Sequence, residues 1–456
     1  MAGVISHHEL EYHSQRYAVI IILALSLIVF LGPLILRVAD GSPITPGGES
    51  YTLLHDADIL LSGSSTDTVP FQRSVPSPYA ILLAFMALFG VPWLLPPLLA
   101  IAVVMISYLL LTATYGQRSM ALFAAVALII SPLMSVLATW HAPLLLCSLL
   151  VLGAIAIGRF APAFIAAAIL THPVGGSLAA MAFIAYAAYR KEWVRSAVIA
   201  GSSTAIAIVT ILLFGTRPFH ELVFASWSPD IIFELGMPTG VSVFLLILAC
   251  YGIMVDFTGR RIAWFSVLIA LMLGSMAFPS LLIALTVIIA LLVGHAVHRL
   301  LVVEWRLSML QESLLILIGC IALFLVITTM RERLADDPDA ALSRTLITLR
   351  NTERDGAILT DPQDAPFVRH FSGRKPALET NDHSDIFLSR DAVRAYAFME
   401  SSDVAYVVIT DAMRDDLLLE GEDGILFLLQ HSGRFVPIAS PGGASVWYFI
   451  QLERDG

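Results

Sequence analysis

Apolar runs of roughly membrane-spanning length recur through the first 330 residues, with short polar segments between them. A spanning helix needs about 20 mostly apolar residues, because only a helix satisfies its own backbone hydrogen bonds inside hydrocarbon. The pattern therefore predicts a polytopic α-helical membrane protein with about eleven spans. The runs cover residues 18–36, 93–113, 120–138, 143–158, 161–171, 175–189, 196–214, 238–256, 262–275, 279–297 and 312–330.

Some apolar stretches are too short for an ideal span. The two runs that flank Thr171-His172-Pro173 are compatible with a tilted hairpin, a re-entrant pair or one long broken span. Residues 79–90, between Pro78 and Pro92, form about three helical turns, and we expect them in the membrane interface or dipping into the bilayer. The first run has no small-residue cleavage site after it, so we interpret it as a retained anchor.

The composition agrees with a bilayer as the main solvent. Hydrophobic residues make up 58% of the chain and charged residues 14%, and the mean hydropathy is +0.83. These values lie outside the range of soluble globular domains. The three cysteines all fall inside apolar runs, which indicates small core side chains rather than disulfides or a metal site.

Basic residues predict the orientation. With a cytoplasmic N-terminus at residues 1–17, the cytoplasmic segments hold ten Lys and Arg residues and the outer loops before the tail hold three, Arg37, Arg73 and Arg217. This bias places the chain in the plasma membrane with everything after residue 330 on the extracytoplasmic side. Eight of the twelve acidic residues of the membrane domain, residues 18–330, lie in the two large outer loops, residues 38–78 and 216–237.

The tail, residues 331–456, has the composition of a separate soluble domain. It contains 13 Lys and Arg against 22 Asp and Glu, a net charge of −9 out of the chain's −10. Strands are predicted at residues 357–360, 404–409, 435–439 and 446–452, and a helix that opens with Ser389 and Asp391 at 389–401. Strands alternating with helices predict a small extracytoplasmic α/β domain with a mostly parallel sheet and a final edge hairpin. Its acidity argues against nucleic acid as a partner.

Several short motifs resemble one family of membrane enzymes. The first outer loop reads Gly-Gly-Glu-Ser-Tyr-Thr-Leu-Leu-His-Asp-Ala-Asp over residues 47–58, and Val-Pro-Ser-Pro-Tyr opens the next apolar segment at 75–79. Together with Ser-Pro-Leu at 131–133, Thr-His-Pro at 171–173 and the tail segments 355–359, 372–374 and 404–409, this resembles the GT-C superfamily of membrane glycosyltransferases. The likeness is to archaeal members related to oligosaccharyltransferase catalytic subunits.

The resemblance implies transfer of a sugar from a polyprenyl-phosphate-linked donor in the bilayer to an acceptor on the extracytoplasmic face, the acceptor being a glycan, protein or lipid. Glu49 occupies the position of the family's first-loop acid and is therefore expected to be the general base or a ligand of Mg²⁺ or Mn²⁺. Asp56 and Asp58 are the next catalytic candidates. If this loop is helical, Glu49 and Asp56 share a face and Asp58 is rotated away by about half a turn. The alternative for Asp56 and Asp58 is a solvated helix face.

Five further residues are expected to bind substrate or its phosphate: Tyr51, His55, His172, Arg217 and His220. A guanidinium at Arg217 would hold a phosphate through two parallel hydrogen bonds. His172 stands before a proline at a turn, where its imidazole would either bond phosphate or cap a helix end.

One departure from the family concerns the acceptor. Oligosaccharyltransferases of this type carry a Trp-Trp-Asp motif in the soluble domain, whereas this tail has only Trp447. We therefore favour transfer of a monosaccharide over transfer of a whole oligosaccharide to asparagine. Two other functions remain open, a transporter or flippase for a lipid-linked or small solute, and a non-catalytic envelope assembly protein. A transporter would be expected to carry ionisable residues at mid-membrane depth, and the predicted spans are almost free of charge.

Overall fold

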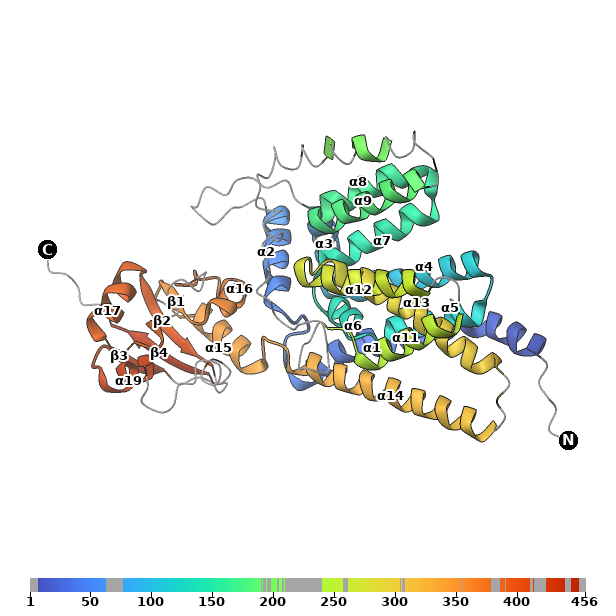
Figure 1. Ribbon diagram of the computed structural model, residues 1–456. Helices are drawn as coiled ribbons and strands as arrows, with labels where there is room; N and C mark the ends of the chain where they lie inside the picture. The colour runs from blue at the N-terminus through green and yellow to red at the C-terminus, as the bar shows by residue number, and fades with distance from the viewer. Residues whose placement is uncertain are drawn as a thin grey trace. The chain divides into compact units, whose positions relative to one another are not determined.

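The structure is a computed structural model. It describes residues 7–62, 77–189, 191, 194, 198–202, 205–206, 209, 240–256, 261–303, 305, 308–352, 354–378, 386–389, 391–410, 413, 424–438 and 444–450. The chain divides into two compact units, which Figure 1 traces by residue number. The helical unit comprises residues 1–34 and 56–334, and the C-terminal unit comprises residues 35–55 and 335–456.

The helical unit is built from mostly apolar helices. Among the described residues, four helical segments are long and apolar enough to cross a membrane, or six if each of two bent pairs counts as one span, and four shorter apolar helices accompany them. This supports the predicted class, and the number of eleven spans stays a prediction. The helices are α1 (His7–Asp40), α2 (Gly48–Ser62), α3 (Pro78–Leu88), α4 (Leu95–Tyr115), α5 (Arg118–Ile129), α6 (Pro132–Thr139), α7 (Pro143–Ala156), α8 (Ala161–Thr171), α9 (Pro173–Tyr189), α11 (Val243–Asp256), α12 (Arg261–Ala277), α13 (Leu281–Val302) and α14 (Ser308–Ala335).

Prolines set where several of these helices begin. Proline fits the first helical turn because its missing N–H would have no partner there. At the start of α3, the Ser77 hydroxyl also accepts the Ala80 N–H at 3.1 Å. Pro132 splits the predicted run 120–138 into α5 and α6, which meet at a bend of 61°. The helices α7 and α8 meet at 119°, so they form a sharply bent pair.

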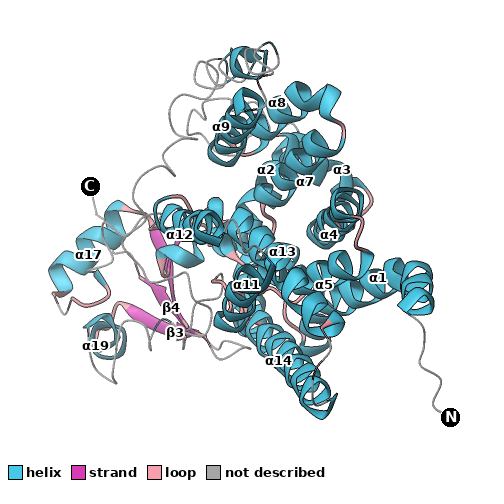
Figure 2. Cartoon of the chain, turned by 45° about the vertical axis from the view of Figure 1, so that its right-hand side comes forward, coloured by secondary structure: helices cyan, strands magenta, loops and turns pink. Residues whose placement is uncertain are grey.

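Small residues let the central helix α13 approach its neighbours closely. A Cβ on Gly294 of α13 would lie 2.6 Å from the Met120 carbonyl oxygen of α5. A Cβ on Gly252 of α11 would lie 2.4 Å from the Leu292 oxygen of α13. Figure 2 shows α5, α11 and α13 as neighbouring helices of this unit. Van der Waals packing at such contacts is a main source of stability for helices in lipid, where no hydrophobic effect drives their association.

The C-terminal unit contains a four-stranded sheet in the order β1-β2-β4-β3. Its strands are β1 (Ala357–Leu359), β2 (Val404–Ile409), β3 (Phe435–Ile438) and β4 (Ser445–Phe449). All four predicted strands are present, but the prediction of a mostly parallel sheet is wrong, because only β1 and β2 pair in parallel. The predicted edge hairpin is confirmed, because β4 returns antiparallel to β3. The strand β4 also lies between β3 and β2 and pairs antiparallel with both, so two of the three strand pairings are antiparallel.

Helices cover both faces of this sheet. The strand β2 is buried at all six positions, as expected for a strand covered on both sides. One face packs on α17 (Ala392–Ser401) and α19 (Gly424–His431), and the other packs on α15 (Ala340–Arg350) and the segment around α16 (Ala365–Phe367). Figure 1 shows α17 and α19 on one side of the strands and α15 and α16 on the other.

Aspartates cap the two longer helices of this unit. Asp339 accepts the Leu342 N–H at 2.6 Å and begins α15. At α17, the cap is Asp391, which accepts the N–H groups of Val393 and Arg394. Ser389 instead accepts the Asp391 N–H, so the predicted serine cap is displaced by two residues.

Candidate functional site

The part of the first loop that carries Glu49, Asp56 and Asp58 is a helix, which was the condition for Glu49 and Asp56 to share a face. Residues Gly48–Ser62 form α2, with Glu49 in the first turn. At about 100° per residue, Glu49 and Asp56 lie on one face and Asp58 lies about half a turn away. The side chains of Glu49 and Asp58 are exposed, and those of Asp56 and His55 are half-buried. A carboxylate at Glu49 also benefits from the positive end of the helix dipole.

Tyr51 attaches the first turns of α2 to the core of the C-terminal unit. Its side chain is only 3% exposed, and its hydroxyl donates to the Thr45 carbonyl oxygen at 2.8 Å. The ring contacts three others, with centroid distances of 5.3 Å to Phe367, 4.9 Å to His370 and 5.1 Å to Phe371. Burial raises the pKa of the Tyr51 hydroxyl far above its ordinary value, so the group stays protonated. Tyr51 is therefore a core residue of this unit, and its predicted contact with substrate stays a prediction.

Arg37 fixes the chain just before α2. Its guanidinium is 1% exposed and donates three hydrogen bonds to carbonyl oxygens, to Pro43 at 3.0 Å, Asp336 at 2.5 Å and Pro338 at 2.8 Å. A buried cation is tolerated only when its donors are satisfied in this way. The same segments meet again where the Gly47 N–H donates to the Asp337 oxygen at 2.7 Å. Residues 35–55 are thus tied to the start of the C-terminal residues.

A buried aspartate lies in this part of the C-terminal unit. Asp364 is 8% exposed and accepts a long hydrogen bond of 3.4 Å from the Thr360 hydroxyl. Burial, together with the nearby carboxylates of Asp337, Asp361 and Asp339, raises the pKa of Asp364 to about 7. The adjacent Gln363 oxygen lies 3.5 Å from the place a Cβ on Gly48 would take, so this turn packs against the start of α2.

The described residues do not form an evident metal site. No group of three or more His, Cys, Asp or Glu side chains with a metal-binding arrangement occurs among them. The expectation of Mg²⁺ or Mn²⁺ at Glu49 therefore stays a prediction. We derive no step of the reaction through a metal ion.

Of three further predicted phosphate ligands, the structure describes His172, whereas Arg217 and His220 lie outside the described residues. His172 lies between α8 and α9, where its Nδ1 accepts the Gly175 N–H at 3.0 Å. This is the helix-capping arrangement that was one of its two expected roles. Gly176 lies beside it with no room for a Cβ, which would come within 2.4 Å of the Ile169 nitrogen.

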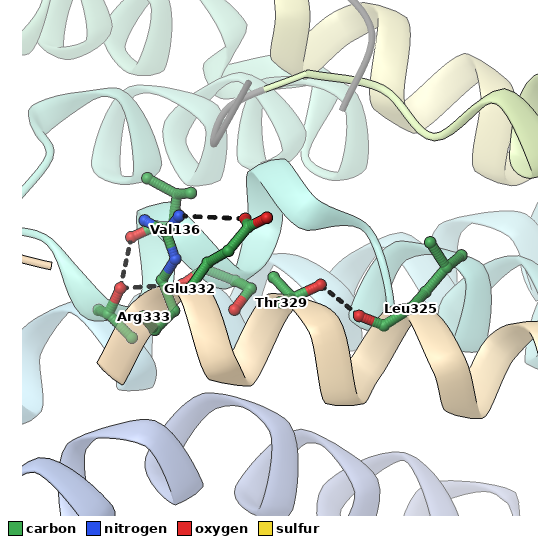
Figure 3. A network of polar contacts seen from close by, with 7 residues as sticks. Val136, Leu325, Thr329, Glu332 and Arg333 are labelled. Atoms are coloured by element: carbon green, nitrogen blue, oxygen red, sulfur yellow. Dashed lines mark hydrogen bonds and ion pairs between the residues drawn. The ribbon is translucent and has the colours of Figure 1, made fainter. Parts of the chain in front are cut away.

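The end of α14 carries a buried arginine that the sequence pattern did not single out. Arg333 is fully buried, with Nη2 3.8 Å from a Glu332 carboxylate oxygen and the guanidinium carbon 6.0 Å from the centre of the Trp140 ring. Figure 3 shows Arg333 and Glu332, together with the Thr329 hydroxyl that donates to the Leu325 carbonyl oxygen. The cation and the aromatic face attract each other and hold the turn after α6 to the end of α14.

Tyr79 and His141 form a second buried pair in the helical unit. Both side chains are at most 1% exposed, and the Tyr79 hydroxyl lies 3.1 Å from His141 Nδ1. Only indirect signals in the sequence point to these residues and to Arg37 and Asp364. Each is a polar side chain beside a proline or at the end of an apolar run, and the pattern does not show which of them become buried.

The fold is shared with solved membrane enzymes. AglB, an archaeal oligosaccharyltransferase from Archaeoglobus fulgidus solved with an inhibitory peptide and a dolichol-phosphate, is 13% identical with a TM-score of 0.62, covering 97% of this chain and 75% of that one. ArnT from Cupriavidus metallidurans bound to undecaprenyl phosphate is 12% identical with a TM-score of 0.56, covering 95% and 98%. An AglB structure with Zn and sulfate has a TM-score of 0.56 at 13% identity, covering 96% and 74%.

These similarities establish the fold. The chain has the GT-C fold, as the resemblance of its motifs predicted. No protein-family model matches the sequence, and no curated protein sequence matches it either.

Proposed function

We propose that this protein is a GT-C-type glycosyltransferase that moves a sugar from a polyprenyl-phosphate-linked donor to an acceptor on the extracytoplasmic side of the plasma membrane. The observation that carries the proposal is the GT-C fold over nearly the whole chain, found in proteins solved with dolichol-phosphate and undecaprenyl phosphate. The exposed carboxylate of Glu49 at the anchored start of α2 supplies a reactive group in the loop where the motifs lead us to expect one.

The proposed chemistry is a single displacement at the anomeric carbon of the donor. Glu49 accepts the proton of an acceptor hydroxyl, the hydroxyl oxygen forms a bond to the anomeric carbon, and the bond from that carbon to the phosphate oxygen breaks. The polyprenyl phosphate leaves with the bonding electrons. Asp56 lies on the same face of α2 as Glu49, which makes it a better candidate than Asp58 for a second polar contact to the sugar.

One feature supports a monosaccharide rather than an oligosaccharide as the transferred group. Trp447 is the tail's one tryptophan, and it is buried to 8% exposure in the core between the sheet and α17 and α19. It therefore has little surface with which to contact an acceptor peptide.

Substitution of Glu49 by Gln tests the proposal. The full-length protein, reconstituted with polyprenyl-phosphate sugars, should transfer sugar to an acceptor, and E49Q should lower the turnover by roughly 100-fold or more, as expected for loss of a general base. D58N is the matched control, because it removes an exposed carboxylate from the other face of the same helix. Transfer by E49Q at the wild-type rate, with equal expression, would remove Glu49 from the mechanism. Movement of the intact lipid-linked sugar across the bilayer without transfer would instead support the transporter alternative.

A further inference from the structure

The first turns of α2 are held from both sides of Glu49. On one side, the Gly47 N–H donates to the Asp337 oxygen, with Gly47 in the left-handed region at φ +83° that favours glycine. On the other side, Tyr51 enters the aromatic group of Phe367, His370 and Phe371. The backbone of Glu49 lies between these two attachments, while its side chain remains exposed.

We propose that Tyr51 is a positioning residue, through which the C-terminal unit fixes the place and direction of the Glu49 carboxylate. This inference rests on the proposed function of Glu49 as the base. It adds a role for the C-terminal domain that is separate from acceptor recognition.

Helix geometry sets the direction of the carboxylate. Two residues along an α-helix correspond to about 200°, so Tyr51 and Glu49 project about 160° apart. Leu54, which is partly buried against the same cluster as Tyr51, follows it at helical spacing and widens the attached face. Because this face is fixed on the C-terminal core, the opposite face, with Glu49, points away from that core. Rotation of the helix would have to remove Tyr51 from its aromatic surroundings.

The attachment is strong enough to act as a fixed support. Tyr51 belongs to a buried cluster with Leu342, Leu346, Ile358 and Val408, which joins it to α15 and to the parallel strand pair β1 and β2. Burial of the aromatic side chain and its contacts with three neighbouring rings both stabilise this attachment. Arg37 reinforces the preceding chain through its three carbonyl contacts.

Misplacement of a catalytic group by about 1 Å can cost about 100-fold in rate, so loss of the attachment should appear mainly in turnover. We expect Y51L to reduce kcat roughly 10- to 100-fold, with the KM for the lipid-linked donor changed by less than about twofold. Y51F keeps the ring and loses only the bond to the Thr45 oxygen, so its kcat should stay within about threefold of wild type.

Tyr406 offers a matched control in the same cluster. It is also 3% exposed, and its hydroxyl donates to the Thr352 hydroxyl at 2.9 Å. Y406L therefore loses similar packing on the same face of the sheet without touching α2. We expect it to lower the resistance of the C-terminal unit to urea about as much as Y51L does, with kcat within about threefold of wild type. An equal loss of kcat in Y406L and Y51L would overturn the positioning role and leave only a structural one.

Hydrogen exchange tests the inference without any assay of transfer. In the full-length protein, amides of residues 47–55 should exchange at least about tenfold faster in Y51L than in wild type, Y51F or Y406L. Unchanged exchange in Y51L would overturn the inference whatever the activity. If the wild-type protein transfers no sugar but the exchange pattern appears, the proposed function fails, and the attachment of Glu49 by Tyr51 stands.

Discussion

Replacement of Asp364 by Asn should change the pH dependence of stability of the C-terminal unit. Asp364 has its pKa raised from 3.8 to about 7 by burial and by neighbouring carboxylates. Between these two values the folded state keeps a proton that the unfolded state has lost, so stability falls as pH rises through this window. The stabilisation is complete below pH 4 and is lost above pH 7. Three pKa units correspond to roughly 4 kcal/mol at 1.36 kcal/mol per unit.

Asparagine imitates the neutral form of this side chain at every pH. The free energy of unfolding of D364N should therefore exceed that of wild type, and the difference should grow by roughly 3 kcal/mol between pH 5 and pH 8, because only wild type loses stability as Asp364 ionises. The measurement is the urea midpoint for thermolysin cleavage within residues 357–449 of the full-length protein in detergent, at both pH values. D403N, which removes an exposed carboxylate of the same unit, is the control. A difference between D364N and wild type that is the same at both pH values would refute the reasoning.

Three further predictions concern the buried contacts of the fold. R37M removes the three hydrogen bonds that the Arg37 guanidinium donates to carbonyl oxygens, so the free energy of unfolding of the C-terminal unit should fall by roughly 2–5 kcal/mol. The same proteolysis measures this change. In G294V, even the Cβ of the new side chain would lie 2.6 Å from the Met120 carbonyl oxygen, so the melting temperature of this variant in detergent should fall by several degrees. G319V is the control and should not change the melting temperature, because nothing lies within 4 Å of a Cβ there. H172A removes the acceptor for the Gly175 N–H and should cost about 1 kcal/mol of stability, while H172N, which can still cap, should lose less. A loss of donor binding in both variants at unchanged stability would instead assign His172 to the phosphate.

Hydrophobic pattern alone determined most of the helical unit. Apolar runs of suitable length and the prolines at or near their starts mark α3, α7, α8 and α9 to within a few residues, because both signals are local. The four strands of the C-terminal unit were found for the same reason. The first loop was expected to be helical only conditionally, and α2 confirms that condition for Glu49, Asp56 and Asp58. The roles of these three residues stay predictions.

Only the tertiary structure decided how segments distant in sequence come together. The pairing of β4 with both β2 and β3 depends on which strand inserts where, and strand content does not specify that choice. The binding of Arg37 to carbonyl groups about 300 residues later, and the entry of Tyr51 into the C-terminal core, likewise leave no periodic signal. Burial of a polar side chain is favourable only when remote partners satisfy it. A single sequence therefore shows that Arg37, Tyr51 and Asp364 are polar, and the fold alone shows which contacts make their burial possible.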